Sequence, residues 1–383
     1  MQTDKYYVTI LKRKKRPLLL SFFVLFLLFL DVTSCVKWLG TYRERKISWN
    51  NTKTCKKIRE NYGLTGEQTK LCKKITDCMP YVYEAAELVI TTCQNLFRHR
   101  LWNCSSIKLL PHLSQDLSAG TKERAFVHAL SAAALTYTIA KGCASSSIYS
   151  CSCSPHPAEP PNGNFKWGGC GDNISWGSKF TRQFVDVKKK PIDKLKKYNK
   201  TYTYYDYTEQ KNDEKIEDDN DIIEYNKGFN QQIKNYNNEI GRKVVSDSLI
   251  THCKCHGVSG SCSIKTCWKG LPLKFHEIGE KLMTSYKSAV QVHPLTKPEQ
   301  LMNRFSDAQS LLYVTKSLDY CEFNTNVGSF WTSGRIPQKY DNFFITVYTI
   351  AFLSMLKKNV TLAPIAKTVV KICVVDEDLN QVQ

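Results

Sequence analysis

Hydrophobic residues recur at roughly helical spacing in two stretches of this chain. Residues 67–98 hold few helix breakers apart from Pro80, and their recurring apolar positions are Leu71, Ile75, Val82, Ala86, Val89 and Cys93. Residues 120–141 open with Gly120 and Thr121 and carry an apolar stripe made of Phe126, Leu130, Ala133, Ala134 and Tyr137. Such spacing is typical of helices that bury one face. We therefore predict two helical segments that contribute buried faces to a core.

The pattern changes after the second stretch. Residues 143–177 are rich in Gly, Pro, Ser and Cys, which is typical of loops and short hairpins held by cross-links. Residues 188–238 contain no cysteine and are dense in Lys, Tyr, Asn, Asp and Glu, including the run EKIEDDND. Low apolar content combined with charge runs is typical of disordered segments. We predict a low-complexity, disordered insertion over 188–238.

An apolar run near the start of the chain predicts its compartment. The run Leu18–Leu30 follows the basic cluster KRKKR and precedes a short polar stretch ending in Ser34 and Cys35. This arrangement is typical of a secretory signal peptide. Its 13 residues are too few for a membrane span, which needs about 20 helical residues. We predict cleavage after Ser34 or Cys35, and therefore a secreted protein.

Composition narrows the class of partner. The 383 residues are 42% hydrophobic, enough for a real core, and the formal charge is +19. A strongly basic chain favours polyanions such as nucleic acid, acidic lipid headgroups or sulfated glycans. Because the predicted signal peptide directs the chain into the secretory pathway, we expect no nucleic-acid partner.

Cysteines and sequons agree with that compartment. Sixteen cysteines in a chain with a signal peptide indicate disulfides, because the secretory pathway is oxidising. N-x-S/T sequons, the acceptors of N-linked glycans, begin at Asn50, Asn103, Asn173, Asn199 and Asn359. We take these five as glycosylation candidates.

The densest motif is CKCHGVSGSCSIKTCW, which begins at Cys253. Nested pairing of its four cysteines would staple the stem of a tight hairpin and present residues 257–261 at a rigid tip. A structural zinc site is the alternative, but the spacing C-x-C-x6-C-x4-C matches zinc knuckles poorly. A hydrolase is suggested by Gly257-Val-Ser-Gly-Ser, but a nucleophile elbow needs Gly where Ser261 stands.

The same motif closely resembles the signature of the Wnt family of secreted signalling proteins. The resemblance continues in TTCQNLFRHRLWNC, in GCASSSIYSCSC and in KWGGC. ERAFVHALSAAALTYTIAKGC, KWLG at residues 37–40 and the NNT sequon before Cys55 look most like Wnt subfamily eleven. The resemblance runs from about residue 35 to residue 335, interrupted by the insertion, and implies a ligand rather than an enzyme.

The resemblance implies a fold and a set of disulfides. The expected fold class is α+β and disulfide-rich, with an N-terminal helical domain carrying stapled β-hairpins, followed by a reduced cysteine-rich C-terminal domain. The implied pairs are Cys93–Cys104, Cys143–Cys151, Cys153–Cys170, Cys253–Cys267 and Cys255–Cys262, with Cys55–Cys72 plausible. Cys78 falls where the family has an apolar residue, so we expect a buried free thiol.

The resemblance also implies a lipid and its partners. In this family the serine at the position of Ser259 is esterified with a mono-unsaturated fatty acid by a Porcupine-type acyltransferase. The implied partners are Frizzled receptors and a Wntless-type carrier, and no cofactor or metal is expected. Basic patches such as Lys56-Lys57, Lys73-Lys74 and Lys188–Lys190 suit heparan sulfate in the extracellular matrix. A matrix protein without signalling activity remains an alternative function.

The end of the chain departs from the family pattern. After Arg335 the cysteine-dense family domain is replaced by the apolar stretch Asn342–Leu356, and Cys373 is the sole cysteine. This is either a divergent ligand or a mistranslated tail, and the pairing of Cys35, Cys321 and Cys373 stays open. The predicted division is signal peptide 1–34, helical N-terminal domain 35–187, insertion 188–238, lipid-bearing hairpin region 239–272, linker and start of the C-terminal domain 273–335, and divergent tail 336–383.

Overall fold

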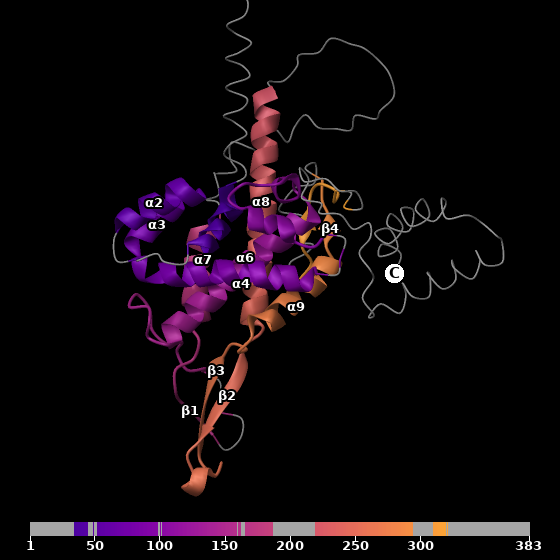
Figure 1. Ribbon diagram of the computed structural model, residues 1–383. Coiled ribbons are helices and arrows are strands. Elements are labelled where there is room, and N and C mark those ends of the chain that lie inside the picture. Colours follow the sequence, from indigo (N-terminus) through magenta and orange to yellow (C-terminus); the bar gives the residue numbers. More distant parts are fainter. Residues whose placement is uncertain are drawn as a thin grey trace, which may run out of the picture.

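The molecule has two visibly different parts, a body of helices and a long hairpin that projects from it (Figure 1). The computed structural model describes residues 34–44, 49, 52–98, 100, 102–158, 160–161, 165–186, 219–293, 309–318 and 320. The α-helices are α2 (Thr52–Tyr62), α3 (Gly66–Lys74), α4 (Met79–Leu96), α5 (Gln115–Ser118), α6 (Lys122–Ala144), α7 (Ile174–Val185), α8 (Asp219–Ser246) and α9 (Phe275–Lys287). The short 3-10 helices are η1 (Ser34–Arg43), η2 (Thr76–Cys78), η3 (Ser105–Leu109) and η6 (Val258–Gly260). The strands are β1 (Lys166–Trp167), β2 (Ile250–Cys255), β3 (Lys265–Gly270), β4 (Val290–Gln291) and β5 (Leu312–Tyr313).

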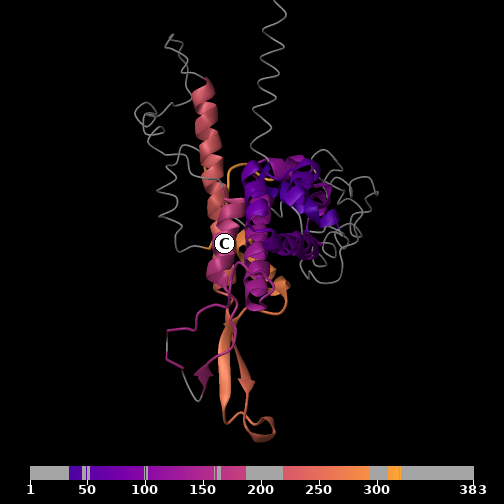
Figure 2. The same cartoon turned by 90° about the vertical axis from the view of Figure 1, so that its left-hand side faces the viewer.

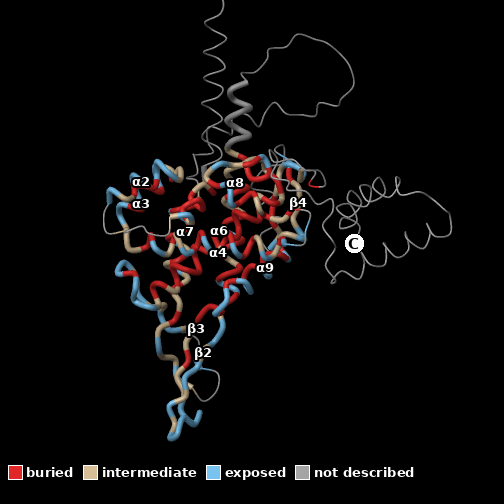
Figure 3. The backbone as a smooth tube through the Cα atoms, viewed as in Figure 1, coloured by how far each residue is buried: buried red, intermediate tan, exposed pale blue. Residues whose placement is uncertain are grey.

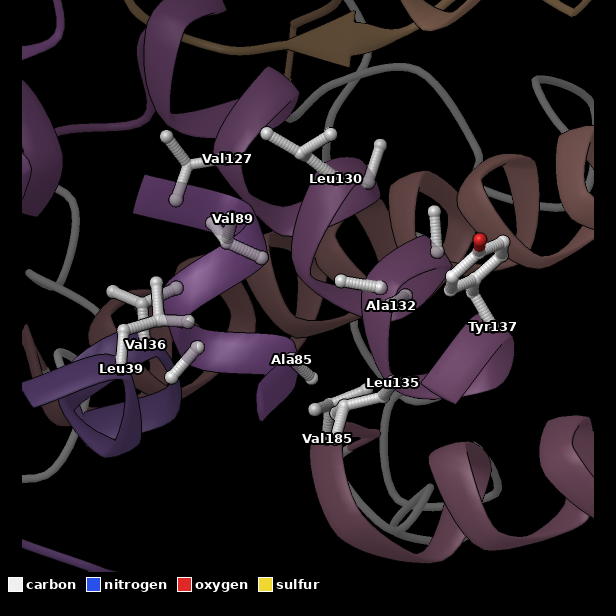
Figure 4. Close-up of a cluster of buried hydrophobic side chains, with 14 of the residues drawn as sticks. Val36, Leu39, Ala85, Val89, Val127, Leu130, Ala132, Leu135, Tyr137 and Val185 are labelled. Carbon is white, nitrogen blue, oxygen red and sulfur yellow. The ribbon is translucent and has the colours of Figure 1, made fainter. Parts of the chain in front are cut away.

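Helix α6 lies at the centre of the body. The helix predicted over 120–141 is confirmed, and its N-cap Thr121 accepts a hydrogen bond from the backbone N–H of Arg124 at 3.2 Å. Burial is not confined to one stripe, because α4, α7, α8 and α9 pack around α6. Figure 4 shows Leu130 and Leu135 of α6 among the neighbouring apolar side chains. The contact with α8 is close at Gly241, where an added Cβ would lie 2.0 Å from the carbonyl oxygen of Ala129.

The helical stretch predicted over 67–98 is confirmed in content but consists of two helices. Helix α3 begins with a capping box, in which Thr65 and Gln68 bond each other's backbone N–H groups. The chain breaks at Ile75 and restarts as α4, where Pro80 lies in the first turn. Proline is tolerated there because that turn has no intrahelical acceptor for its missing N–H group.

The insertion predicted over 188–238 is wrong in its last part. Helix α8 begins at Asp219, and Phe229 and Ile233 are buried. Residues 187–218 lie outside the described part, so the prediction of disorder stays untested there.

The disorder prediction fails in α8 because several polar side chains of this helix are buried and have hydrogen-bond partners. Asn237 is 2% exposed; its Nδ2 donates to the carbonyl oxygen of Leu312 at 2.8 Å, and its Oδ1 accepts from the N–H of Leu312 at 2.9 Å. Asn238 is 1% exposed, and its Nδ2 donates to Oδ1 of Asp186 at 2.9 Å. Such pairing satisfies groups whose burial alone would be costly.

The boundary predicted at residue 273 is also wrong. Helix α9 packs on α4 and α6 and buries Ile278 and Leu282 in the same core as α6. A parallel pair of strands follows, with Val290 opposite Leu312. The described residues of 273–335 therefore continue the helical body instead of forming a linker. The predicted cysteine-rich C-terminal domain, with Cys321, lies outside the described residues.

Other predictions also fall outside the described part. Residues 1–33 and 336–383 are not described, so the signal peptide and the divergent tail stay predictions. Within the described residues, none of the helices combines the length and apolar character that crossing a bilayer requires.

Candidate functional site: the stapled hairpin

Strands β2 and β3 form an antiparallel hairpin that extends away from the helices (Figure 2). In their register Cys253 lies directly opposite Cys267. Strand β1 joins the outer edge of β3 in parallel, giving the order β1-β3-β2. The loop and short hairpin predicted within 143–177 are present in part, because Ser154 and Gly171 form an isolated antiparallel bridge between cross-linked loops, while Lys166–Trp167 pair elsewhere. That segment contributes a strand to a sheet formed with residues a hundred positions later, a pairing that no local pattern indicates.

Two nested disulfides staple this hairpin. Cys253 bonds Cys267 and Cys255 bonds Cys262, with Cα atoms 4.1 and 4.6 Å apart. Both separations are below the ~7 Å beyond which two cysteines cannot be bridged. All four sulfur atoms are in covalent bonds, so the zinc alternative has no thiolate ligands. Among the described residues, no three His, Cys, Asp or Glu side chains cluster as a metal site.

The remaining disulfides lie in the body and in the loops between the body and the hairpin. They are Cys55–Cys72, Cys93–Cys104, Cys143–Cys151 and Cys153–Cys170, the pairs that the family resemblance implied. Cys78 is free and buried, as expected. Burial raises the pKa of its thiol well above the ordinary value, and the neighbouring Asp77 adds to that effect. The side chain of Cys35 and all of Cys321 and Cys373 lie outside the described residues.

The tip of the hairpin is a compact turn. The N–H of His256 donates to the carbonyl oxygen of Ile264 at 2.7 Å, and that of Gly257 donates to Ser261 at 2.8 Å. An added Cβ at Gly257 would lie 2.6 Å from the backbone carbonyl oxygen of Ser261, so this turn requires glycine. His256 also contacts Thr266, Nε2 to Oγ1, at 2.7 Å. These contacts hold the tip closed above the inner disulfide.

Ser259 lies within the η6 turn at the end of the hairpin and is exposed. Its backbone is left-handed, with φ 56° and ψ 29°, and Gly260 follows with φ 75°. Few non-glycine residues adopt this conformation, and sequence reasoning gave no sign of it. The serine sits in a single 3-10 turn and not at a strand-to-helix elbow, which removes the geometric basis of the hydrolase alternative.

Two residues that sequence reasoning missed anchor the hairpin to the body. The hydroxyl of Tyr137, on α6, lies 2.9 Å from the carbonyl oxygen of Pro272 and 3.0 Å from that of Leu273. Burial raises the pKa of Tyr137, so its hydroxyl remains a donor. Oδ2 of Asp172 accepts a hydrogen bond from the N–H of Leu271 at 2.6 Å. Because both contacts link segments far apart in the chain, spacing alone could not reveal them.

The asparagines of the two described sequons differ in exposure and in hydrogen bonding. Asn173 is buried as the N-cap of α7, and its Nδ2, the atom that a glycan would occupy, donates to Ser152 at 2.8 Å. This geometry disfavours glycosylation there. Asn103 is partly exposed and bonds Ser105 of its own sequon. Asn50, Asn199 and Asn359 lie outside the described residues.

Comparison with known proteins gives the family. Residues 60–342 match the Wnt family. The chain is 38% identical to protein Wnt-11b-2 of Xenopus tropicalis over 79% of each chain. It is 37% identical to Wnt-11 of Xenopus laevis over 85% of this chain and 84% of that one. It is 35% identical to Wnt-5a of Ambystoma mexicanum over 72% and 71%.

Structural similarity is weaker. A chain in human WLS in complex with WNT8A aligns with a TM-score of 0.39 and 26% identity, over 66% of this chain and 72% of that one. The N-terminal domain and linker of Drosophila WntD align with a TM-score of 0.39 and 18% identity, over 64% and 98%. The family match spans more than half of the chain, and the Wnt-11 relatives align along most of their own length. The chain therefore belongs to the Wnt family.

Proposed function

We propose that this chain is a lipid-modified ligand of Frizzled-type receptors, with a mono-unsaturated fatty acyl group esterified to Ser259. Wnt family proteins are secreted signalling glycoproteins that act in development, and they are not enzymes. Acylation of Ser259 and binding to a Frizzled-type receptor go beyond family membership, and the features of this structure that support them follow.

The observation that carries the proposal is the presentation of Ser259. The residue is exposed, at the far end of a hairpin that stands clear of the body (Figures 1 and 2). Two disulfides and the compact turn fix its position without a core beneath it. A hydroxyl on such a tip is accessible to a membrane-embedded acyltransferase of the Porcupine type.

A fatty chain at this point would dominate binding. Each buried CH₂ contributes about 0.8 kcal/mol, so a chain of a dozen or more carbons contributes on the order of 10 kcal/mol as an upper bound. The acyl chain would supply most of the affinity of this protein for an apolar groove on a Frizzled receptor. The same apolar group would make the free protein poorly soluble, which implies a Wntless-type carrier during export. The exposed Lys56, Lys73 and Lys74 are suited to heparan sulfate, and matrix association is part of the proposal.

The test is Ser259→Ala. The variant should lose the acyl adduct, Frizzled binding and carrier-dependent export, while the fold stays nearly unchanged. An exposed substitution of this kind shifts stability by less than about 0.5 kcal/mol, whereas each ~1.4 kcal/mol of lost contact is tenfold in affinity. Intact-mass analysis of protein from acyltransferase-competent cells detects the adduct.

Ser261→Ala is the matched control. Ser261 lies two residues away on the same tip and bonds only another exposed serine through its side chain, with 3.0 Å between its Oγ and that of Ser263. Its replacement should leave the adduct and receptor binding in place. A wild-type protein without an adduct, or a Ser259→Ala protein that binds Frizzled as well as wild type, would overturn the proposal. If the wild-type protein binds sulfated glycans but does not bind Frizzled, the result would favour a matrix protein instead.

A further inference from the structure

We propose that the end of the hairpin docks the protein on membranes that carry acidic lipid headgroups, with the tip side chains entering the bilayer interface and the lysines of one hairpin face lying among the headgroups. This goes beyond the proposed function, because the surface is made of protein side chains and does not use the acyl group.

The strand register defines the face. Residues directly opposite each other in a sheet point to the same side. Lys254 of β2 lies opposite Thr266 of β3, and Thr266 is paired with Lys166 of β1, so both lysines flank the threonine in one row across the sheet. The next row toward the body pairs His252 with Trp268, whose rings stack 6.2 Å apart. We call this side the lysine face.

The Lys, Asp and Glu content of the hairpin is entirely basic. Residues 250–270 include Lys254, Lys265 and Lys269 and contain no Asp or Glu. Lys166 and Lys254 on the lysine face are exposed. On the opposite face, which carries both disulfides, Nζ of Lys269 lies over the ring of Trp167 and bonds Thr251 at 2.9 Å. The lysine face therefore offers exposed cations without an acid in its own strands, which complements an anionic surface.

Exposed apolar side chains at the tip select a membrane over a sulfated glycan. Val258, in the same turn as Ser259, is 90% exposed, and Ile264, which directly precedes β3, is 63% exposed. A glycan supplies anions but no apolar phase in which these side chains could be buried. A bilayer surface supplies both.

The spacing along the strands fits the depth of a bilayer interface. Strands rise about 3.3 Å per residue, so the lysine row lies about 7 Å from Ile264. The headgroup region on each side of the hydrocarbon core is about 5–7 Å thick. With Ile264 at the hydrocarbon boundary, Lys166 and Lys254 lie among the headgroups, which long lysine side chains reach readily. Trp268 lies another two residues out, near the water side.

The experiment measures partition of the full-length protein into phosphatidylcholine vesicles with and without phosphatidylserine. The readout is the partition coefficient with phosphatidylserine divided by the partition coefficient without it. The contribution of any acyl chain cancels in this ratio. The failure of acylation at Ser259 and the failure of this proposal are therefore distinguishable. The double variant Lys166→Gln, Lys254→Gln should lower the ratio about 25-fold, about fivefold for each lysine.

Lys179→Gln, Lys287→Gln is the control, since it removes the same charge from exposed positions of α7 and α9; its ratio should stay within about twofold of wild type. Ile264→Ser should weaken binding to both vesicle types and leave the ratio unchanged, which would support insertion of the tip. A hairpin double variant that matches the control would overturn the proposal. So would loss of heparin binding with the phosphatidylserine preference retained, since that outcome assigns the face to a glycan.

Discussion

The helical body and the hairpin keep their shapes by different means. In the body, α6 is buried on all sides and its neighbours bury their apolar faces against it. Along the hairpin most residues are exposed or intermediate, as the pale and tan tube in Figure 3 shows. Its two disulfides and backbone ladder replace a core. A cross-linked element can face solvent on both sides, and this leaves the hairpin surface available for partners. We therefore expect that destabilising the body does not open the hairpin, and that opening the hairpin does not destabilise the body.

The largest effect is expected from a cavity in the body. Leu130→Ala removes a fully buried side chain from the centre of α6, and such substitutions cost about 3 kcal/mol. The free energy of unfolding, followed by far-UV circular dichroism in denaturant, should fall by that amount. The Cys253–Cys267 and Cys255–Cys262 bonds should still form, as peptide mapping would show. Loss of the hairpin disulfides in this variant would mean that the two parts are coupled.

A smaller and local effect is expected from opening the tip. Cys255→Ser together with Cys262→Ser removes a link that closes a short loop, worth about 2 kcal/mol in loop entropy. Amide hydrogens of residues 256–264 should exchange faster, and acylation at Ser259 should drop with them. The denaturation midpoint of the body should be unchanged. A shift of that midpoint comparable to the Leu130→Ala shift would contradict the separation.

The smallest effect is expected at Cys78. Cys78→Ala leaves a small apolar side chain in a buried site and should lower stability by about 1 kcal/mol or less. Because burial raises the pKa of this thiol, little thiolate forms near neutral pH, and thiols react as thiolates. Mass mapping after treatment with iodoacetamide should find Cys78 unlabelled in native protein and labelled in denaturant. Rapid native labelling would show that the body opens locally at η2.

The sequence predicted local features well and long-range ones poorly. The helix around Leu130 and the stapled turn around Ser259 depend on patterns within a few residues, and both are present. The disulfide pairing came from the family resemblance, since spacing alone leaves many connectivities open. The insertion boundary failed because Asn237 and Asn238 count as solvated residues in a composition, while their actual partners, Leu312 and Asp186, are distant in sequence.

The left-handed backbone at Ser259 restricts which residue can carry the proposed ester. Threonine has the same hydroxyl, but its branched Cβ is strongly disfavoured at a φ of 56°. Glycine and asparagine adopt that conformation readily, yet they offer no oxygen nucleophile. Serine alone among these four combines the reactive group with a tolerable fit. An exchange between serine and threonine, which is conservative in chemistry, is therefore not conservative in geometry at this tip.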